Sequence, residues 1–167
     1  MAAAHCGKYN HHMPEESLRE DLVIRPHRAA DVPVLYQIDQ ICFDKGIAFS
    51  RAEILFHLNR RDNLTKVAEL DGLVVGFAVG RIEAPSWAHI LTLDVIPEAR
   101  RRRIGTSLLN VLHEEFRRRK VLFVNLEVST TNIAAKQLYE RFQYKCVETL
   151  YGYYRGDADA YRMIRSL

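Results

Sequence analysis

Two segments in the second half of the chain constrain its fold most strongly, because each follows a strand, loop and helix pattern. They span residues 91–109 and 126–142. In each, an apolar run of strand length leads through a polar stretch into apolar residues spaced three or four apart, as on one face of a helix. Strands that alternate with helices in this way favour a mixed α/β domain whose sheet is partly parallel.

Start signals for two further helices lie in the first third of the chain. Asp31 is a candidate N-cap, with Pro33 in the first turn that follows it. Ser50 and Glu53 have the spacing of a capping box, which marks the beginning of a second helix. Two later helices are expected over residues 104–120 and 132–142.

The strands are expected in an order that surrounds these helices. Asp71-Gly72 is a two-residue hairpin signal between two strand-like runs. Gly76 and Gly80 lie on one face of the second run, where they either permit a close approach or weaken the strand. Residues 121–128 read as a strand buried on both faces. The expected strands are residues 22–25, 65–69, 73–82, 89–95, 121–128, 144–150 and 158–164.

Size and composition indicate one folded domain. The chain has 167 residues, of which 48% are hydrophobic, and no apolar run approaches the roughly 20 residues that span a membrane. Residues 1–20 are mostly polar and predict a flexible leader ahead of a single domain at 21–167. The three cysteines are widely spaced, which favours a reducing cytoplasm and indicates neither a disulfide framework nor a metal site.

A basic loop at residues 100–106 precedes the helix that begins near Ile104. The first turn of a helix presents unpaired N–H groups and a partial positive charge, and together these bind anions such as phosphate. Arg100 to Arg103 would add charge, and Gly105 would let the backbone approach a ligand. The net charge is only +3, and a second basic cluster at residues 117–120 is interpreted chiefly as solvated surface.

This loop resembles the acetyl-CoA signature of the GNAT acetyltransferase superfamily, Arg/Gln-x-x-Gly-x-Gly/Ala. Gly105 matches the second glycine, whereas Arg103 replaces the first. If that position needs a conformation that glycine favours, coenzyme affinity is weakened; alternatively, the arginine adds a phosphate contact. The resemblance implies a GNAT fold, in which about four helices flank a mostly antiparallel sheet of six to seven strands with a splayed parallel pair.

The second segment resembles the subgroup that acetylates protein N-termini, including the bacterial ribosomal-protein alanine acetyltransferase. The resemblance rests on Glu127, Asn132-x-x-Ala135 and Tyr139, and it continues to Tyr153-Tyr154. Gln143 departs from it, because a glycine is usual at this helix end. The resemblance implies acetyl-CoA as co-substrate and no metal, with these residues at the coenzyme: Leu93, Val95, Arg100, Arg101, Arg102, Arg103, Ile104, Gly105, Thr106, Asn132 and Ala135.

The chemistry implied is direct attack of an amine on the thioester, which needs two proton transfers. Glu127 is the candidate base, directly or through water, and Tyr139 the candidate acid for the leaving thiolate. Both residues also admit a structural interpretation, Glu127 as a polar strand end and Tyr139 as packing. Tyr153 and Tyr154 are candidates to hold the substrate backbone. His89 is a weaker candidate, as a proton relay, because most histidines in such strands are structural.

The expected acceptor is a protein or peptide N-terminus, with a ribosomal protein as one candidate. An α-amine has a pKa of about 7.7 to 8.0, against about 10.4 for lysine, so it loses its proton more easily. Two alternatives stay open: a small-molecule amine as acceptor, and a non-catalytic module that binds coenzyme or RNA. Nucleic acid is not expected, because the basic clusters lack interleaved aromatic residues for base stacking. A membrane partner is not expected either, and the chain is taken as a monomer or homodimer.

Overall fold

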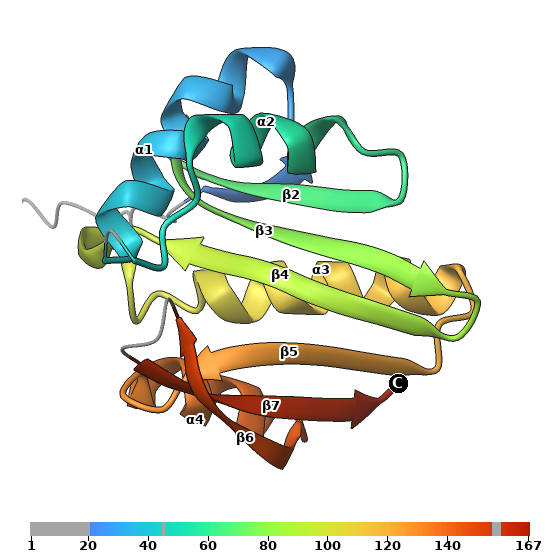
Figure 1. Ribbon diagram of the computed structural model, residues 1–167. Helices are drawn as coiled ribbons and strands as arrows, with labels where there is room; N and C mark the ends of the chain where they lie inside the picture. The colour runs from blue at the N-terminus through green and yellow to red at the C-terminus, as the bar shows by residue number, and fades with distance from the viewer. Residues whose placement is uncertain (1–20, 45, 155–157) are drawn as a thin grey trace, which may run out of the picture.

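The computed structural model describes residues 21–44, 46–154 and 158–167 and contains a seven-stranded sheet (Figure 1). The strand order is β1-β2-β3-β4-β5-β7-β6. The strands are β1 (Leu22–Pro26), β2 (Asn63–Leu70), β3 (Leu73–Ala84), β4 (Trp87–Val95), β5 (Phe123–Ser129), β6 (Lys145–Tyr154) and β7 (Ala158–Ser166). The helices are α1 (Val32–Cys42), α2 (Arg51–Asn59), α3 (Ile104–Arg118) and α4 (Ile133–Arg141), with short 3-10 turns at Ala29–Asp31 and Pro97–Ala99.

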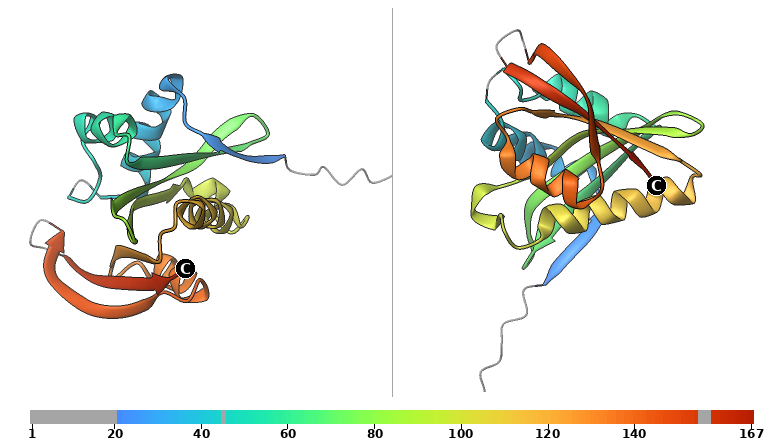
Figure 2. Two further views of the ribbon diagram at one scale, coloured as in Figure 1. Left: turned by 90° about the vertical axis from the view of Figure 1, so that its right-hand side faces the viewer. Right: turned by 90° about the horizontal axis from the view of Figure 1, so that it is seen from below.

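The helices cover both faces of the sheet. Helices α1 and α2 lie on one face and α3 and α4 on the other, as the left view of Figure 2 shows. The larger core packs the inner face of α3 against the sheet, with Leu108, Leu112 and Phe116 fully buried. A smaller core lies under α1 and α2 around Phe77. The period of four in the α3 sequence therefore faces the sheet, as a buried amphipathic stripe should.

Gly80 is required by the close approach of α3 to β3. A Cβ built at this position would lie 2.4 Å from Cζ of Phe116, inside the ring's contact distance. At Gly76 a Cβ would instead meet the backbone oxygen of Asp94 at 2.5 Å. Of the two readings of these glycines, the structure favours the close approach.

The only parallel pair in the described sheet is β4 with β5, and its pairing is short. It runs from Trp87 beside Phe123 to Ile90 beside Leu126 and then stops, although both strands continue. A register shift between β3 and β4 at the same level leaves Leu91 without a partner on β3. A bulge of this kind bends and re-aims a strand. The two halves of the sheet therefore separate beyond Ile90, which is the splay that the resemblance implies.

Most of the predicted elements are present with shifted ends. The hairpin at Asp71-Gly72 is confirmed, with positive φ at both residues (49° and 80°). The capping box of α2 is confirmed as well, since Ser50 and Glu53 exchange side-chain and backbone hydrogen bonds. The leader expected at residues 1–20 lies outside the described residues. Among the helices that the structure describes, none is long and apolar enough to cross a membrane.

Two local predictions are wrong. Asp31 stands at the N-cap of α1, but its side chain does not cap that helix. Its carboxylate instead accepts hydrogen bonds from the Arg25 guanidinium (2.7 and 3.0 Å) and from the Arg28 N–H (2.7 Å). Strand β5 is not buried on both faces: Val124, Leu126 and Val128 are buried, while the residues between them are partly exposed. The half-open face is the one that carries Glu127.

Candidate active site

Glu127 lies at the splay, one residue past the last pair between β4 and β5. Its side chain is 8% exposed and is held by two cationic or polar partners. Oε2 is 2.7 Å from Nε2 of His89, and Oε1 accepts a hydrogen bond from Nε of Arg162 at 3.2 Å. Because a carboxylate only accepts hydrogen bonds, the His89 nitrogen that faces it carries the proton.

The pKa of Glu127 is lowered in this setting. Burial alone would raise it, but the hydrogen bonds and charges of His89 and Arg162 outweigh burial. Glu127 is therefore ionised at neutral pH. On its far side, Nδ1 of His89 is 3.3 Å from Oε1 of Glu83, which is half-exposed. His89 thus connects the buried carboxylate with one that reaches solvent.

Tyr139 projects from α4 toward the same region and is almost fully buried. Helix α4 begins at Asn132, whose side chain accepts the Ala135 N–H at 3.1 Å, so the predicted cap is confirmed. Burial raises the pKa of Tyr139, and the neighbouring Asp94 and Tyr154 add to the shift. A tyrosine in this setting keeps its proton at neutral pH and is able to donate it.

Tyr153 and Tyr154 belong to β6, which extends further than the sequence predicted. Their rings pack edge to face with centroids 5.0 Å apart. Burial raises the pKa of both, and the charge of Glu127 contributes to each shift. The structure therefore brings both tyrosines next to the glutamate; Tyr153 is 45% exposed and open to a substrate.

Two buried carboxyl groups near the site were not singled out in the sequence. Asp94 of β4 is 1% exposed, and one of its oxygens accepts a hydrogen bond from Thr92 while the other has no partner among the described residues. Burial raises its pKa well above the usual range. Asp39 of α1 is fully buried and accepts the Phe49 N–H at 2.8 Å, and burial raises its pKa to about 6. In the sequence, Asp94 could have been found because Thr92 and Asp94 are polar residues at alternate positions of an otherwise apolar strand.

The arginine loop leads into α3 through a left-handed backbone. Arg101 and Arg103 have φ of 63° and 61°. The first hydrogen bond of the helix runs from the Ser107 N–H to the Arg103 carbonyl at 2.9 Å. The N–H groups of Ile104, Gly105 and Thr106 therefore precede the helical ladder, where an anion binds best.

The side chains of this segment are not equivalent. Ile104 is buried in the core, so it offers its N–H group alone. A Cβ at Gly105 would lie 3.3 Å from Leu138 and 3.4 Å from Leu93, so this glycine lets α3 pack near α4 and β4. Arg100 folds back, and its Nε donates to the Val95 carbonyl at 3.0 Å. Cys42 donates to the same carbonyl at 3.4 Å. Leu93 and Val95 were the two predicted main-chain contacts of the coenzyme, and the Val95 carbonyl is thus already engaged by two side chains.

Replacing Arg103 with glycine is expected to raise the free energy of unfolding by about 1 kcal/mol, because an L side chain is strained at positive φ. Gln143 provides a matched comparison. It ends α4 in a Schellman motif at φ 64°, with Gln143 N–H bonded to Glu140 and Tyr144 N–H to Tyr139. Gln143→Gly should give a similar gain in urea unfolding. If Arg103 contacts phosphate, only Arg103→Gly will also weaken coenzyme binding measured by calorimetry.

The candidate residues thus form two groups around one splay. Glu127, Tyr139, Tyr153 and Tyr154 surround its open end, and the loop at residues 100–106 lies where α3 and α4 meet β4. Within the described ranges, the His, Cys, Asp and Glu side chains form no group of three that could hold a metal ion. Little in the sequence indicated that His89 belongs to the site. Only the strand register sets it beside Glu127.

The chain is similar to proteins of known family. The model of the acetyltransferase (GNAT) family matches residues 32–144. An N-alpha-acetyltransferase of Saccharolobus solfataricus is 29% identical, with 93% of this chain and 99% of that protein covered. The crystal structure of Ard1 from Thermoplasma volcanium superimposes with a TM-score of 0.81 at 28% identity, covering 87% of this chain and 97% of that one.

A second solved structure, the ribosomal-protein-S18-alanine N-acetyltransferase from Escherichia coli, gives a TM-score of 0.80 at 25% identity. The alignment covers 87% of this chain and 94% of the bacterial enzyme. The fold, the splay and the loop before α3 agree with the family match, which covers more than half of the 167 residues. The chain belongs to the acetyltransferase (GNAT) family.

Proposed function

We propose that this protein transfers the acetyl group of acetyl-CoA to the α-amine of a protein N-terminus. The observation that carries the proposal is Glu127, a buried and ionised carboxylate that faces a tyrosine pair where the sheet splays. The relatives support it, because they are named as an N-alpha-acetyltransferase and a ribosomal-protein alanine N-acetyltransferase. A strand edge, a carboxylate and a tyrosine pair with one exposed member together suit a peptide better than a small, freely rotating amine.

The coenzyme would supply the activated acetyl group, and the residues at its end of the splay fit it. The free N–H groups at the start of α3 and the charges of Arg101 to Arg103 would hold its phosphates. The unpaired edge of β4 beyond Ile90 would bond its pantetheine arm, chiefly through the main chain at Leu93. Asn132 and Ala135 stand at the start of α4 on the other side of this path.

The protein side chains would perform the two proton transfers. Glu127 would take the proton of the attacking amine, directly or through water, while His89 and Arg162 hold its carboxylate in place. A carboxylate of lowered pKa is a weak base, so the transfer suits an α-amine better than a lysine. Tyr139 would give its proton to the leaving sulfur. Tyr153 and Tyr154 would hold the peptide backbone beside Glu127.

The test is release of free thiol from acetyl-CoA in the presence of peptides. The panel pairs each free N-terminus with its blocked counterpart and varies the first residue. Alanine is included, because one structural neighbour is named for a ribosomal-protein alanine. The proposal requires release that depends on a free N-terminus. Release with polyamines or amino acids but with no peptide would replace it by a small-amine acetyltransferase.

Tyr139→Phe is expected to lower kcat by about 10²-fold, the lower end of the usual contribution of a general acid, while the KM for acetyl-CoA stays within about twofold. The phenyl ring keeps the packing against Tyr144 and removes only the hydroxyl proton. Steady-state kinetics on a good peptide measures both constants. Tyr161→Phe, on β7 and partly exposed, is the matched control and should behave like the wild type. Wild-type kcat in Tyr139→Phe would show that another group protonates the thiolate.

A further inference from the structure

Trp87 and Phe123 form an exposed aromatic pair at the end of the molecule away from the splay. They begin β4 and β5 and are partners in the parallel register. Their rings stack with centroids 4.9 Å apart and planes at 27°, yet they remain 36% and 37% exposed. Leu122 beside them is 53% exposed. A stacked and exposed aromatic pair with an exposed leucine beside it is a candidate surface for a partner.

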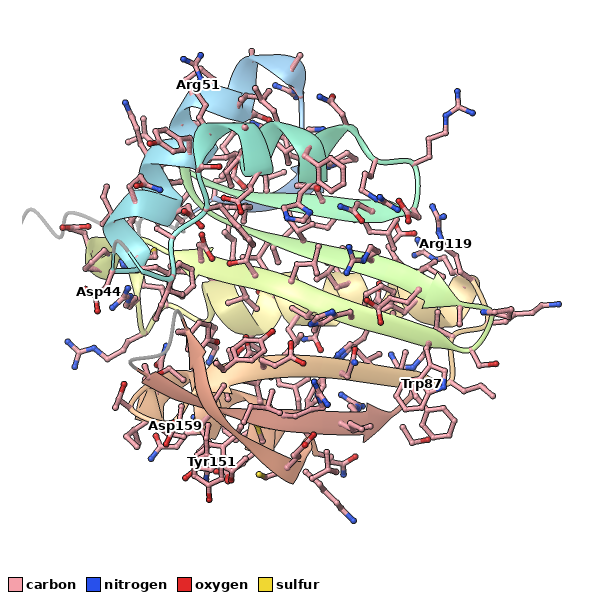
Figure 3. All side chains as sticks on the ribbon, viewed as in Figure 1. Asp44, Arg51, Trp87, Arg119, Tyr151 and Asp159 are labelled. Carbon is pink, nitrogen blue, oxygen red and sulfur yellow. The ribbon has the colours of Figure 1, made fainter. Side chains whose placement is uncertain are left out.

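The basic end of α3 lies directly beside this pair. Helix α3 ends at Arg118, and the backbone N–H groups of Leu122 and Phe123 then donate to the Ser86 carbonyl, each at 2.9 Å. These bonds hold the segment that follows Arg119 and Lys120 against the turn that precedes Trp87. Figure 3 shows Trp87 and Arg119 at the same end of the sheet.

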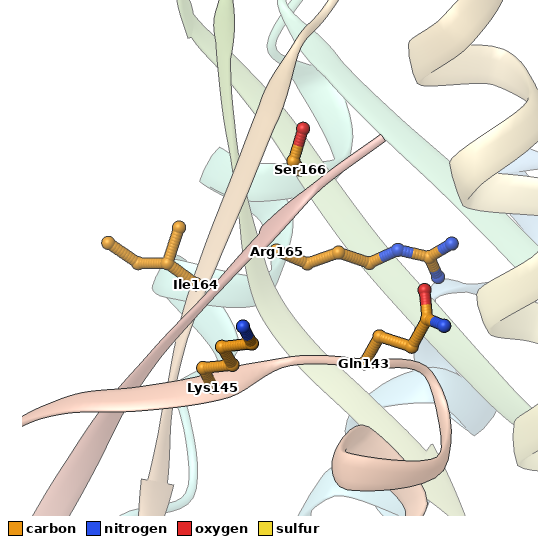
Figure 4. Close-up of a pocket in the computed structure, with 5 residues that line it drawn as sticks. All are labelled: Gln143, Lys145, Ile164, Arg165 and Ser166. Atoms are coloured by element: carbon orange, nitrogen blue, oxygen red, sulfur yellow. The ribbon is translucent and has the colours of Figure 1, made fainter.

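The end of β7 lies next to the aromatic pair, but its basic side chain belongs to the opposite face of the sheet. The Leu167 N–H donates to the Leu122 carbonyl at 2.9 Å, which places this strand end next to the aromatic pair. Arg165 pairs with Val124, whose side chain is buried against α3, so Arg165 points away from Phe123 and lines the hollow of Figure 4 together with Gln143, Lys145, Ile164 and Ser166. Nε of Arg165 is buried and bonds to no described residue, while its Nη1 donates to His113 at 3.2 Å.

Most of the cations at the end of α3 lack a carboxylate partner. Within the described part of the chain, Arg117, Arg119 and Lys120 form no salt bridge. Cations in the last turn of a helix complement its dipole, and this explains Arg117. It does not explain an exposed stacked pair of aromatic rings beside these cations.

We propose that this face, formed by Trp87 and Phe123 with Arg119 and Lys120 beside them, binds single-stranded RNA. Unpaired bases stack on exposed aromatic rings, and arginine and lysine neutralise the phosphates between them. An acidic protein segment would satisfy the charges but would leave the aromatic rings without a planar partner. The face is separate from the proposed coenzyme loop, because the 15 residues of α3 place the two ends about 22 Å apart.

This inference revises the expectation that nucleic acid does not bind. That expectation rested on the lack of aromatic residues within the basic clusters of the sequence. The structure supplies them from elsewhere: Trp87 is 30 positions or more from the cluster at residues 117–120 and reaches it through the β4–β5 pairing. Phe123 follows this cluster directly in the sequence, and its ring stacks on the ring of Trp87.

The test uses Trp87 as its own reporter, since the chain contains one tryptophan. The full-length protein is saturated with coenzyme A, so that adenine-containing RNA cannot bind at the coenzyme loop, and is titrated with a ten-nucleotide oligo-adenylate. We expect quenching of the tryptophan fluorescence and a Kd that weakens steeply with salt. Three to four phosphate contacts give a log–log slope of about −2 to −3 for a single strand.

Variants separate stacking from charge, with binding followed by the anisotropy of labelled RNA. Trp87→Leu should weaken binding about 5- to 100-fold, as loss of one stacked base does. Arg119→Glu should weaken it several-fold and reduce the salt slope by about one. Arg51→Glu is the matched control: Arg51 is exposed, lies far from Trp87 in Figure 3, and should bind as the wild type does. Acetyl transfer to a peptide should persist in all three.

Three results would overturn the proposal. One is the absence of RNA binding at 50 mM salt, or binding there that does not weaken as the salt concentration is raised. Another is equal affinity for inorganic polyphosphate together with no effect of Trp87→Leu, which would make the face a general anion patch. The third is tighter binding of an acidic peptide than of RNA, which would identify the partner as a protein.

Discussion

Glutamine in place of Glu127 is expected to lower kcat toward a peptide with a free N-terminus by about 10²- to 10⁴-fold, the usual contribution of general acid–base catalysis. Glutamine has nearly the same shape and can still bond to Arg162, but it cannot accept a proton from the amine. Acetyl-CoA binding should be unchanged, because the glutamate faces the substrate side of the splay. Stopped-flow single turnovers with preformed coenzyme complex measure the chemical step directly.

The pH dependence makes this prediction specific. The deficit of Glu127→Gln should shrink above about pH 8, where the α-amine loses its proton without help. Glu148→Gln is the matched control, because Glu148 also binds Arg162, at 2.8 Å, but is half-exposed and is the outer carboxylate of that arginine. Its kcat should stay within about threefold. A deficit in Glu127→Gln that persists unchanged to pH 10 would mean that Glu127 positions the substrate rather than takes its proton.

The elements that could be predicted were those specified by local chemistry. The hairpin at Asp71-Gly72, the capping box at Ser50 and the cap at Asn132 each depend on residues that are close in sequence. The predicted cap of α1 failed because Arg25, six residues earlier, forms a buried ion pair with Asp31. The spacing of residues in a capping motif cannot predict an ion pair with a residue of another element.

The site could be predicted in part for the same reason. Glu127 and Tyr139 could be identified because they belong to a recognisable motif. The partners of Glu127, in contrast, depend on strand register. His89 is 38 positions away and meets the glutamate because β4 and β5 pair in parallel up to Ile90. Asp39 and Asp94 come close because α1 packs over β4. Registers and packing of this sort follow from the whole fold, which short motifs do not encode.

Protonation of His113 is expected to destabilise the fold strongly in acid. His113 lies on α3, is 1% exposed, and bonds through Nε2 to the Tyr144 hydroxyl at 2.7 Å. Burial, with the nearby charges of Arg165 and Arg117, lowers its pKa to about 3. The unfolded chain binds this proton near pH 6.5, so the contribution is fully present above pH 6.5 and is lost as pH falls toward 3. The loss approaches about 1.4 kcal/mol per pH unit within that window.

Asp39 changes the stability with pH in the opposite direction, so the contribution of His113 can be tested separately. Its pKa is raised to about 6, so its neutral form favours the fold, and that contribution is lost as pH rises from about 4 to 6. In urea unfolding between pH 4 and 6, His113→Gln should therefore lose its deficit relative to the wild type as pH falls, by about 2 to 3 kcal/mol. Asp39→Asn should show the reverse trend and gain most relative to the wild type at pH 6. Parallel curves for His113→Gln and the wild type would mean that His113 takes up its proton in the folded state as readily as in the unfolded chain.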